Sequence, residues 1–315
     1  MYNKNMNRTI HYSIKQESGG ITVGAFLKNM GYSHHILTHL KRTDQGICID
    51  GLPVFTSHAL KPGERLTVRI VEEESSPHIT PVNLPFSISY EDEDILVINK
   101  PAGMPVHPSQ GNYENTLANG VAWYFQQQDT PYVFRCINRI DRETSGLLIL
   151  AKHMLSGAVL SKSMKEHRIS RTYLALVQGC PSQELGTIDV PIGRCPHSIL
   201  ERRTDPAGES AVTHYRVLAS SGGASLVKLK LDTGRTHQIR VHMKHIGHPL
   251  LGDFLYNPGN RDCPRQALHS YSLAFPHPVS GEAMFFQCPL PKDLEHVLRS
   301  RSFSDICLSL PVRQP

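Results

Sequence analysis

The sequence lacks the features that direct a protein into a membrane or out of the cell. It contains no run of about eighteen apolar residues, so it predicts no transmembrane helix. Its N-terminal stretch, MYNKNMNRTIHYSIK, has no apolar core of the kind that a signal peptide needs. The seven cysteines are odd in number, scattered and without a C-x-x-C pair, which favours reduced thiols over a disulfide framework. We therefore expect a cytoplasmic protein that does not enter a membrane.

A strong excess of charge of one sign is also missing. Lys and Arg together number 33 against 28 Asp and Glu, which gives a formal net charge of +5, and hydrophobic residues make up 39% of the chain. This composition is typical of a globular protein, and its mild basic excess suits a polyanionic partner without requiring one. The 315 residues suffice for one large domain and one small domain, and no internal repeat is visible.

The most informative stretch is NRIDRETSG at 138–146, a charged turn that leads directly into the apolar run Leu147–Leu150. Such a run, bounded by glycine, predicts a strand that is buried on both faces. Asp141 therefore lies at the entrance to the core, where a carboxylate is costly to desolvate unless it is paired. Arg139 and Arg142 flank it and are candidate partners. These residues alone leave two interpretations open: a structural ion pair or a functional carboxylate.

A second charged segment, LDTGRTHQIRVHM at 231–243, follows a predicted strand. Thr236 is the candidate N-cap of a helix that ends near Gly247. Arg240 is adjacent to the apolar face of this helix, so its guanidinium is expected at the rim of the core, unless it is an ordinary solvated charge. The apolar face consists of Ile239, Met243 and Ile246.

Two other functions that this segment could indicate are disfavoured. Asp232-Thr233-Gly234 has the pattern of an aspartic protease, but that chemistry needs two such aspartates in contact, and Asp141 is followed by Arg142 rather than Thr-Gly. The histidines of the segment lack the spacing of a zinc helix and have no acidic residue among them, so no metal site is predicted and phosphate contact or plain exposure is expected. These histidines are His237, His242, His245 and His248.

The first 75 residues show a separate pattern of short elements. A strand is expected near Ile10–Ile14, and two helices are expected over 23–30 and, after an N-cap at Ser33, over 33–42. Asp50-Gly51 between two apolar runs then predicts a hairpin, and a further strand follows over 66–70.

This order of two helices and then strands resembles an S4-type RNA-binding module. S4 modules usually carry a run of arginines on the second helix, whereas this helix offers Lys41 and Arg42 together with three histidines. Lys41 and Arg42 are therefore the candidate RNA contacts of the module, since neutral histidine contributes little attraction for phosphate.

The rest of the chain is expected to form a larger domain. The charged and proline-containing segment after the last N-terminal strand predicts a linker at 76–84. The division is therefore 1–75 for the small module, 85–300 for the larger domain and 301–315 for a C-terminal tail. Within the larger domain, strands are expected over 95–98, 147–150, 171–177 and 224–231, and helices over 115–126, with Asn115 as N-cap, and 153–166.

The stretch 138–147 resembles motif II of the RluA family of pseudouridine synthases, His-Arg-Leu-Asp-x-x-Thr-Ser-Gly-Leu. Asp141 matches the catalytic aspartate of the family, and Arg139 matches the arginine that helps to displace the target base. Asn138 and Ile140 depart from the pattern, but the family assigns no chemistry to either position.

Three further stretches resemble motifs of the same family. ILVINKPAGMPVHP at 95–108 is similar to the structural motif I. Tyr173 lies in a stretch similar to motif IIa, whose tyrosine packs against the target ring and can handle a proton at its carbon; without the resemblance, a half-buried strand tyrosine is the commoner interpretation. In the segment similar to motif III, Arg240 matches the arginine that pairs with the aspartate, and Ile239 matches the residue that lines the pocket. His237 is a further candidate for contact with RNA.

The resemblance implies an α+β fold, with a mixed, mainly antiparallel sheet and flanking helices in the catalytic domain. The implied activity is isomerisation of uridine in RNA to pseudouridine, with ribosomal RNA favoured over transfer RNA. Asp141 would either attack C1′ or remove a sugar proton, and the sequence does not decide between them. No cofactor or metal is implied, and a monomer is expected. Two alternatives are a non-catalytic S4-type RNA-binding protein and a carboxylate-dependent hydrolase.

Overall fold

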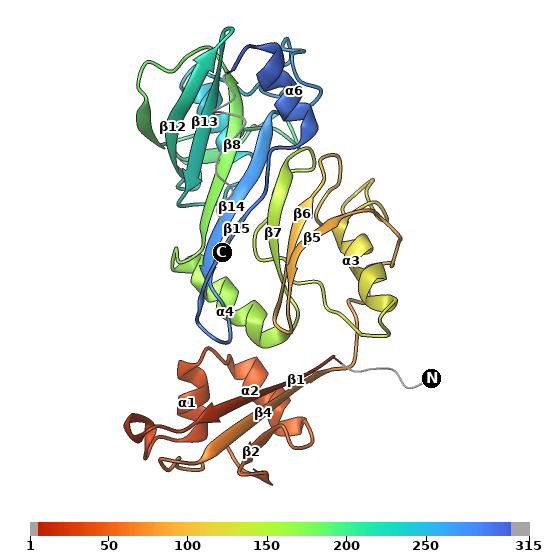
Figure 1. The fold of residues 1–315 in the computed structure, drawn as a ribbon, viewed down its shortest axis with the longest axis vertical. Helices are drawn as coiled ribbons and strands as arrows, with labels where there is room; N and C mark the ends of the chain where they lie inside the picture. The colour runs from red at the N-terminus through yellow and green to blue at the C-terminus, as the bar shows by residue number, and fades with distance from the viewer. Residues whose placement is uncertain (1–5, 304–315) are drawn as a thin grey trace.

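The computed structural model describes residues 6–303, which fold around two main β-sheets (Figure 1). The larger sheet has nine strands in the order β5-β6-β7-β14-β8-β13-β12-β9, with β15 paired to β14 outside this path. The smaller sheet has four strands in the order β1-β4-β2-β3, and β10 and β11 form a separate ribbon. Figure 1 shows the smaller sheet and its helices as a distinct unit below the larger one.

The N-terminal unit consists of a four-stranded sheet covered by two helices. Ser33 caps the second helix by accepting a hydrogen bond from the Ile36 backbone nitrogen, as the sequence predicts. The predicted hairpin is present, and Asp50 (φ 48°) and Gly51 (φ 85°) both adopt the left-handed conformation that such a turn requires. The elements are β1 Met6–Ser13, α1 Val23–Asn29, α2 His34–Arg42, β2 Ile47–Ile49, β3 Leu52–Pro53 and β4 Arg65–Glu72.

The larger unit confirms the predicted mixed, mainly antiparallel sheet, since only β7 and β14 pair in parallel among the described strands. Its strands are β5 Ser87–Glu91, β6 Ile95–Lys100, β7 Ser145–Ala151, β8 Ser170–Gln178, β9 Leu185–Asp189, β10 Ile192–Arg194, β11 Arg202–Thr204, β12 Val212–Ser221, β13 Ala224–Leu231, β14 Leu268–Pro276 and β15 Ala283–Gln287. Its helices are α3 Leu117–Gln126, α4 Met154–Lys165, α5 Gln238–His245 and α6 Lys292–Ser300.

Strand β7 is an internal strand of the large sheet, and every one of its residues is buried. It lies between β6 and β14. Gly146 has a φ of 111°, and a side chain there would collide with the backbone of Ser270 on β14. The glycine therefore permits the close parallel pairing that begins directly after the Asp141 turn. The prediction of a doubly buried strand after that turn is confirmed.

One predicted helix start is wrong by one residue. Helix α3 is capped by Thr116 rather than Asn115, because Thr116 and Asn119 form a reciprocal capping box. The Asn115 side chain instead bonds to Asn112. Asn119 also donates to the Thr80 carbonyl, which ties the helix to the segment that precedes the large sheet.

The two units are joined by ion pairs and by apolar packing. Arg8 on β1 pairs with Asp94 before β6 at 2.7 Å, and Glu72 at the end of β4 pairs with Arg135 at 2.6 Å. Helix α4 packs against the N-terminal helices, and Leu155 belongs to their apolar core (Figure 1). The predicted linker at 76–84 contains no helix or strand, yet these contacts hold the two units together on either side of it.

Within residues 6–303, none of the helices is long and apolar enough to cross a membrane. The predicted tail at 301–315 is described only as far as Phe303, which is buried against α6. Residues 304–315 lie outside the described part of the chain.

Acid is predicted to destabilise the sheet through His269 on β14. This side chain is buried between the Ser145 hydroxyl (2.9 Å) and the Cys288 sulfur (3.1 Å), and burial lowers its pKa from 6.5 to about 4. The unfolded chain therefore binds the proton more tightly, and stability is lost as pH falls from 6.5 through 4, by on the order of 3 kcal/mol. Urea unfolding of wild type across this range measures the loss.

The matched variants are His269→Gln, which should flatten this part of the pH profile, and the exposed His296→Gln, which should leave it unchanged. A wild-type slope in His269→Gln would show that other groups cause the acid sensitivity.

Candidate active site

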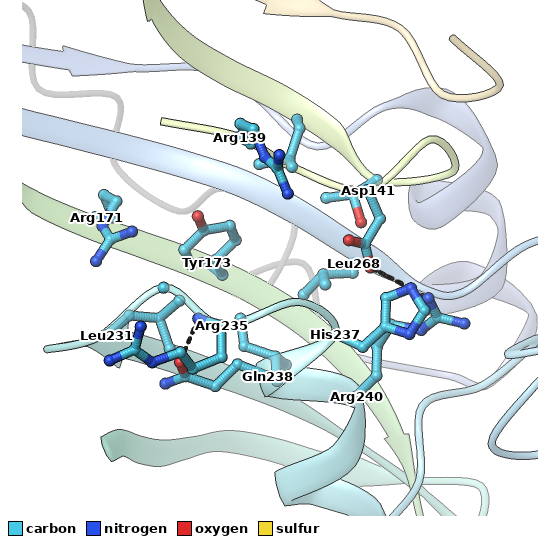
Figure 2. Close-up of a pocket in the computed structure, with 14 residues that line it drawn as sticks. Arg139, Asp141, Arg171, Tyr173, Leu231, Arg235, His237, Gln238, Arg240 and Leu268 are labelled. Carbon is cyan, nitrogen blue, oxygen red and sulfur yellow. Dashed lines mark hydrogen bonds and ion pairs between the residues drawn. The ribbon is translucent and has the colours of Figure 1, made fainter. Parts of the chain in front are cut away.

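A pocket opens between the turn before β7, strand β8 and helix α5. Its empty volume, counted up to the open solvent, is about 410 Å³. The pocket brings together the six catalytic-domain candidates that the sequence predicted, from three regions of the chain (Figure 2). They are Arg139, Asp141, Tyr173, His237, Ile239 and Arg240.

The centre of the pocket is an arginine that joins two carboxylates. Arg240 is 2% exposed, and its Nη1 donates to Asp141 Oδ2 at 3.1 Å. Its Nε and Nη2 donate to the two oxygens of Asp253 at 2.7 and 2.8 Å. Burial alone would lower the pKa of Arg240, but its hydrogen bonds to Asp253 and the charge of Asp141 raise it, so the guanidinium stays charged. Figure 2 shows it directed at Asp141.

Helix α5 begins differently from the sequence prediction. Its first residue is Gln238, and the preceding His237 has a left-handed backbone (φ 58°), so Thr236 is not the N-cap. The side-chain oxygen of Gln238 accepts bonds from the Thr233 hydroxyl and the Arg235 backbone nitrogen instead. The side-chain amide thus replaces the expected cap and ties the helix to the end of β13.

The same start places His237 in the pocket wall. Its Nδ1 lies 2.9 Å from the Tyr256 hydroxyl, and its Nε2 lies 3.9 Å from Asp141 Oδ2. Burial lowers the pKa of His237, an effect that the charge of Asp141 opposes in part. A neutral imidazole therefore faces the carboxylate at neutral pH, beyond hydrogen-bond distance.

Tyr173 and the apolar residues beside it form the floor. Tyr173 is 4% exposed, and burial raises the pKa of its hydroxyl, so the phenol stays protonated at neutral pH. It belongs to one apolar cluster with Ile239, Leu231 and Leu268. A flat ring can pack on such a surface while its polar edge meets the charged side of the pocket.

Arg139 is placed at the rim. It is exposed, and among residues 6–303 it has no hydrogen bond or ion pair. Its neighbour Arg142 is turned away, toward the Gly103 carbonyl and Glu143. Only one of the two flanking arginines is therefore available to a ligand, and neither pairs with Asp141.

The turn that carries Asp141 is held from below by buried polar groups. Asn138 accepts a bond from the Ile149 backbone nitrogen at 2.9 Å and donates to the Leu147 carbonyl. Lys100, which is fully buried, donates to the Arg142 carbonyl at 3.0 Å, and burial lowers its pKa to about 7. Asn138 thus holds the turn in place, at a position where the family pattern has His. Lys100 also holds the turn, which is consistent with a structural role for the stretch that resembles motif I.

Lys41 and Arg42 lie elsewhere. Both are exposed on α2 in the N-terminal unit, and neither lines the pocket around Asp141.

Two of the histidines after β13 are bound to other groups of the protein. His242 is bound to Thr213 and the Val190 carbonyl, and His248 is bound to the Gln178 carbonyl. Over the described ranges, a grouping of side chains that could hold a metal ion occurs at Asp92, Asp94 and His277, which includes none of these histidines.

Asp253 is the functional residue that sequence reasoning missed. It is fully buried, it fixes Arg240, and its Oδ1 also accepts bonds from the Leu255 and Tyr256 backbone nitrogens. The one available signal was an acidic residue within the apolar stretch LLGDFLY at 250–256, since a carboxylate in such a stretch needs a buried cation as partner.

Comparisons with known proteins identify the family to which this chain belongs. Residues 94–245 match the family model described as RNA pseudouridylate synthase. The chain is 39% identical to an uncharacterized RNA pseudouridine synthase, YjbO, of Bacillus subtilis over 90% of this chain and the whole of that protein. It is 40% identical to ribosomal large subunit pseudouridine synthase D of Zymomonas mobilis over 72% of this chain and 76% of that protein.

The chain belongs to the RluA-type family of RNA pseudouridine synthases. In solved structures, human RNA pseudouridylate synthase domain containing 1 superposes with a TM-score of 0.55 at 26% identity, over 73% of this chain and 97% of that one. The chain is therefore an enzyme that isomerises uridine in RNA, and the non-catalytic and hydrolase alternatives are set aside.

Replacing Asp253 with Asn should lower the catalytic rate, although the Asp253 side chain makes no direct contact with the substrate. The amide removes the charge that holds Arg240, so the guanidinium turns toward Asp141 and the carboxylate loses its fixed position. We expect kcat to fall by roughly 10- to 100-fold with little change in KM, together with a loss of about 3 kcal/mol in unfolding free energy. The measurements are pseudouridine formation at saturating RNA and urea unfolding.

Asp205→Asn is the matched control, because it alters a partly exposed aspartate that pairs with Arg203 and accepts a bond from the Ala207 backbone nitrogen, away from the pocket. Equal kinetics in Asp253→Asn and wild type would contradict the positioning role.

Proposed function

We propose that Asp141 is the catalytic carboxylate of this enzyme and that its substrate is ribosomal RNA. The observation that carries the first part is the fixed Asp141–Arg240 pair inside a pocket that has an aromatic floor. The second part is supported by the relatives named ribosomal large subunit pseudouridine synthase D. Transfer RNA is the other possible substrate class.

The reaction requires a base that has left its stack. Eversion costs a few kcal/mol, and the everted uracil has to be held while its bond to the sugar is broken. Tyr173 and Ile239 offer faces on which the ring can pack. Arg139, exposed and unpaired in the described structure, is suited to occupy the space that the base leaves or to hold a phosphate beside it.

Chemistry then proceeds at the sugar. The N1–C1′ bond breaks, the uracil stays bound and turns, and C5 bonds to C1′; the proton leaves C5 and N1 gains one, so the product is an isomer. Asp141 acts either by attacking C1′ or by removing a sugar proton. Arg240 keeps its carboxylate oriented in both cases, because Asp253 holds the other edge of the guanidinium.

Tyr173 is suited to the last step. Its buried ring packs against the turning base, and its protonated hydroxyl is a polar group within the apolar floor that can relay the proton from C5. His237 remains a candidate contact to the nucleotide on the opposite wall. The site needs no metal or cofactor for this isomerisation, since the bond that breaks is remade within the same bound nucleotide.

The N-terminal unit is proposed to be an S4-like RNA-binding module. Its two helices on a four-stranded sheet agree with that assignment, and Lys41 and Arg42 are exposed on the second helix. The proposed division is 1–75 for the module, 76–84 for the linker, 85–300 for the catalytic domain and 301–315 for the tail. We further propose that the enzyme works in the cytoplasm as a monomer.

Asp141→Asn should abolish pseudouridine formation, because the amide can neither attack C1′ nor take a proton. We expect a loss of at least about 10³-fold, or roughly 4 kcal/mol of barrier, with RNA affinity changed only a few-fold. RNA from cells that lack the protein is incubated with each variant, pseudouridine is labelled chemically, and labelled sites are read as reverse-transcription stops. The same maps identify the target uridines.

The matched control is Glu143→Gln, which removes a carboxylate two residues away that pairs with Arg142. It should retain activity. Turnover by Asp141→Asn at the wild-type rate would refute the proposed role.

The double variant Lys41→Met and Arg42→Met tests the module. If each residue contacts one phosphate, the negative slope of log affinity against log salt should become less steep by about 0.7 per lost contact on single-stranded RNA. KM for ribosomal RNA should rise while kcat stays unchanged, because neither side chain reaches the pocket. Lys61→Met, an exposed lysine of the same unit outside α2, is the control. An unchanged slope would argue against RNA contact through α2.

A further inference from the structure

Arg171 on β8 is a buried cation for which the described residues provide no acidic partner. Its side chain is 7% exposed, and it makes one hydrogen bond, from Nη2 to the Thr233 carbonyl at 3.0 Å. Its Nε is buried and has no partner. Because side chains alternate along a strand, Arg171 lies on the same face of β8 as Tyr173, and both line the active-site pocket (Figure 2).

The acidic residues that line the two cavities beside Arg171 are already engaged. Asp141 is paired with Arg240, and Asp232, which lines the adjoining cavity, is bound to His214 at 2.8 Å. A guanidinium that is removed from water without an anion is costly, and an unsatisfied N–H adds to that cost. The chain thus keeps a desolvated positive charge beside the substrate pocket with hydrogen-bonding capacity left over.

Gly234 provides the space in which this guanidinium lies. A Cβ built on Gly234 would stand 2.8 Å from Arg171 Nη1, and its φ is not in the left-handed region. The flexible end of Arg171, rather than the backbone conformation of Gly234, therefore limits the space for a side chain at this position. The chain that follows β13 therefore leaves room for the Arg171 guanidinium.

A second cavity adjoins the active-site pocket, and Arg139, Asp141 and Arg171 line both. It has an empty volume of about 1,320 Å³, and its lining includes Arg139, Lys165 and Arg171. Arg139 and Lys165 are exposed, and neither has an ion pair among residues 6–303. Arg235 also lines this cavity but is paired with Glu209 at 2.5 Å.

We propose that Arg171 binds a backbone phosphate of the RNA next to the everted uridine, and that Arg139 and Lys165 attract the strand along the same cavity. Guanidinium and phosphate form short, charge-assisted hydrogen bonds, which would use the spare N–H groups of Arg171 and compensate its charge. We favour phosphate over uracil as the ligand of Arg171, because Arg171 also lines the adjoining cavity, which includes the exposed Lys165 and does not include Tyr173. The inference rests on the proposed function for the presence of an everted nucleotide.

The test is the salt dependence of RNA binding, which reports phosphate contacts directly. A fluorescent dodecauridylate is titrated with wild type, Arg171→Met and Arg171→Lys between 50 and 300 mM KCl. The plot of log affinity against log salt has a negative slope. Loss of one phosphate contact in Arg171→Met should make this slope less steep by about 0.7. Arg171→Lys, which keeps a point charge for phosphate, should retain most of the slope.

Gly234→Ala tests the same contact without altering a charge. The added methyl group displaces the flexible end of Arg171 while the backbone conformation stays allowed, so the slope should fall as in Arg171→Met. Arg299→Met is the matched control. Arg299 is exposed on α6, which packs on the face of β8 that carries Leu174 and Leu176, opposite the pocket, so this variant should leave the slope unchanged.

Two results would overturn the inference. One is an affinity that falls by the same factor at every salt concentration in Arg171→Met, as expected for contact with uracil or for a purely structural role. The other is no change at all. Because binding needs no turnover, a failure of the isomerase assay for wild type would refute the proposed function and leave this test valid, whereas an unchanged slope with active wild type would refute only the phosphate site.

Discussion

The site depends on one planar guanidinium between two carboxylates. Arg240 uses one edge for Asp253, which is fully buried, and its remaining nitrogen for Asp141, which is partly open to solvent. Two roles are thereby separated: Asp253 carries the structural pairing that keeps a buried cation in place, and Asp141 keeps its outer face free for a substrate. Asp141 alone could not remain oriented at the entrance to the core, because neither flanking arginine pairs with it in the described structure.

The sheet supplies the rigidity that this arrangement needs. The Asp141 turn leads directly into the fully buried β7, and Gly146 lets β14 approach closely enough to pair in parallel with it. Asn138 and Lys100 hold the turn by bonds to backbone groups, so its position is set by the core rather than by solvent-exposed contacts. A site built on such a turn keeps its geometry while the rim residue Arg139 remains unpaired and able to move.

The basic residues in and beside the pocket differ in burial and in pairing. Arg240 is paired with two carboxylates, whereas Arg171 is buried with spare donors, and Arg139 and Lys165 are exposed and line the adjoining cavity. In the proposed complex, Arg171, Arg139 and Lys165 would contact the RNA backbone. Phosphate contacts of this kind would position the strand, and the pocket that holds Tyr173 and Asp141 would then select the base.

The sequence by itself determined the local elements and the motifs: the buried strand after the Asp141 turn, the Asp-Gly hairpin, the helix capped by Ser33, and the residues of the pocket from Arg139 to Arg240. These follow from short-range periodicity, turn chemistry and the resemblance to a family. Only the tertiary structure decided that Asp253 holds Arg240, that Gln238 starts α5, and that Gly234 makes room for Arg171. Each of these depends on side chains from separate strands and loops meeting in space, and no spacing along one segment encodes such a meeting.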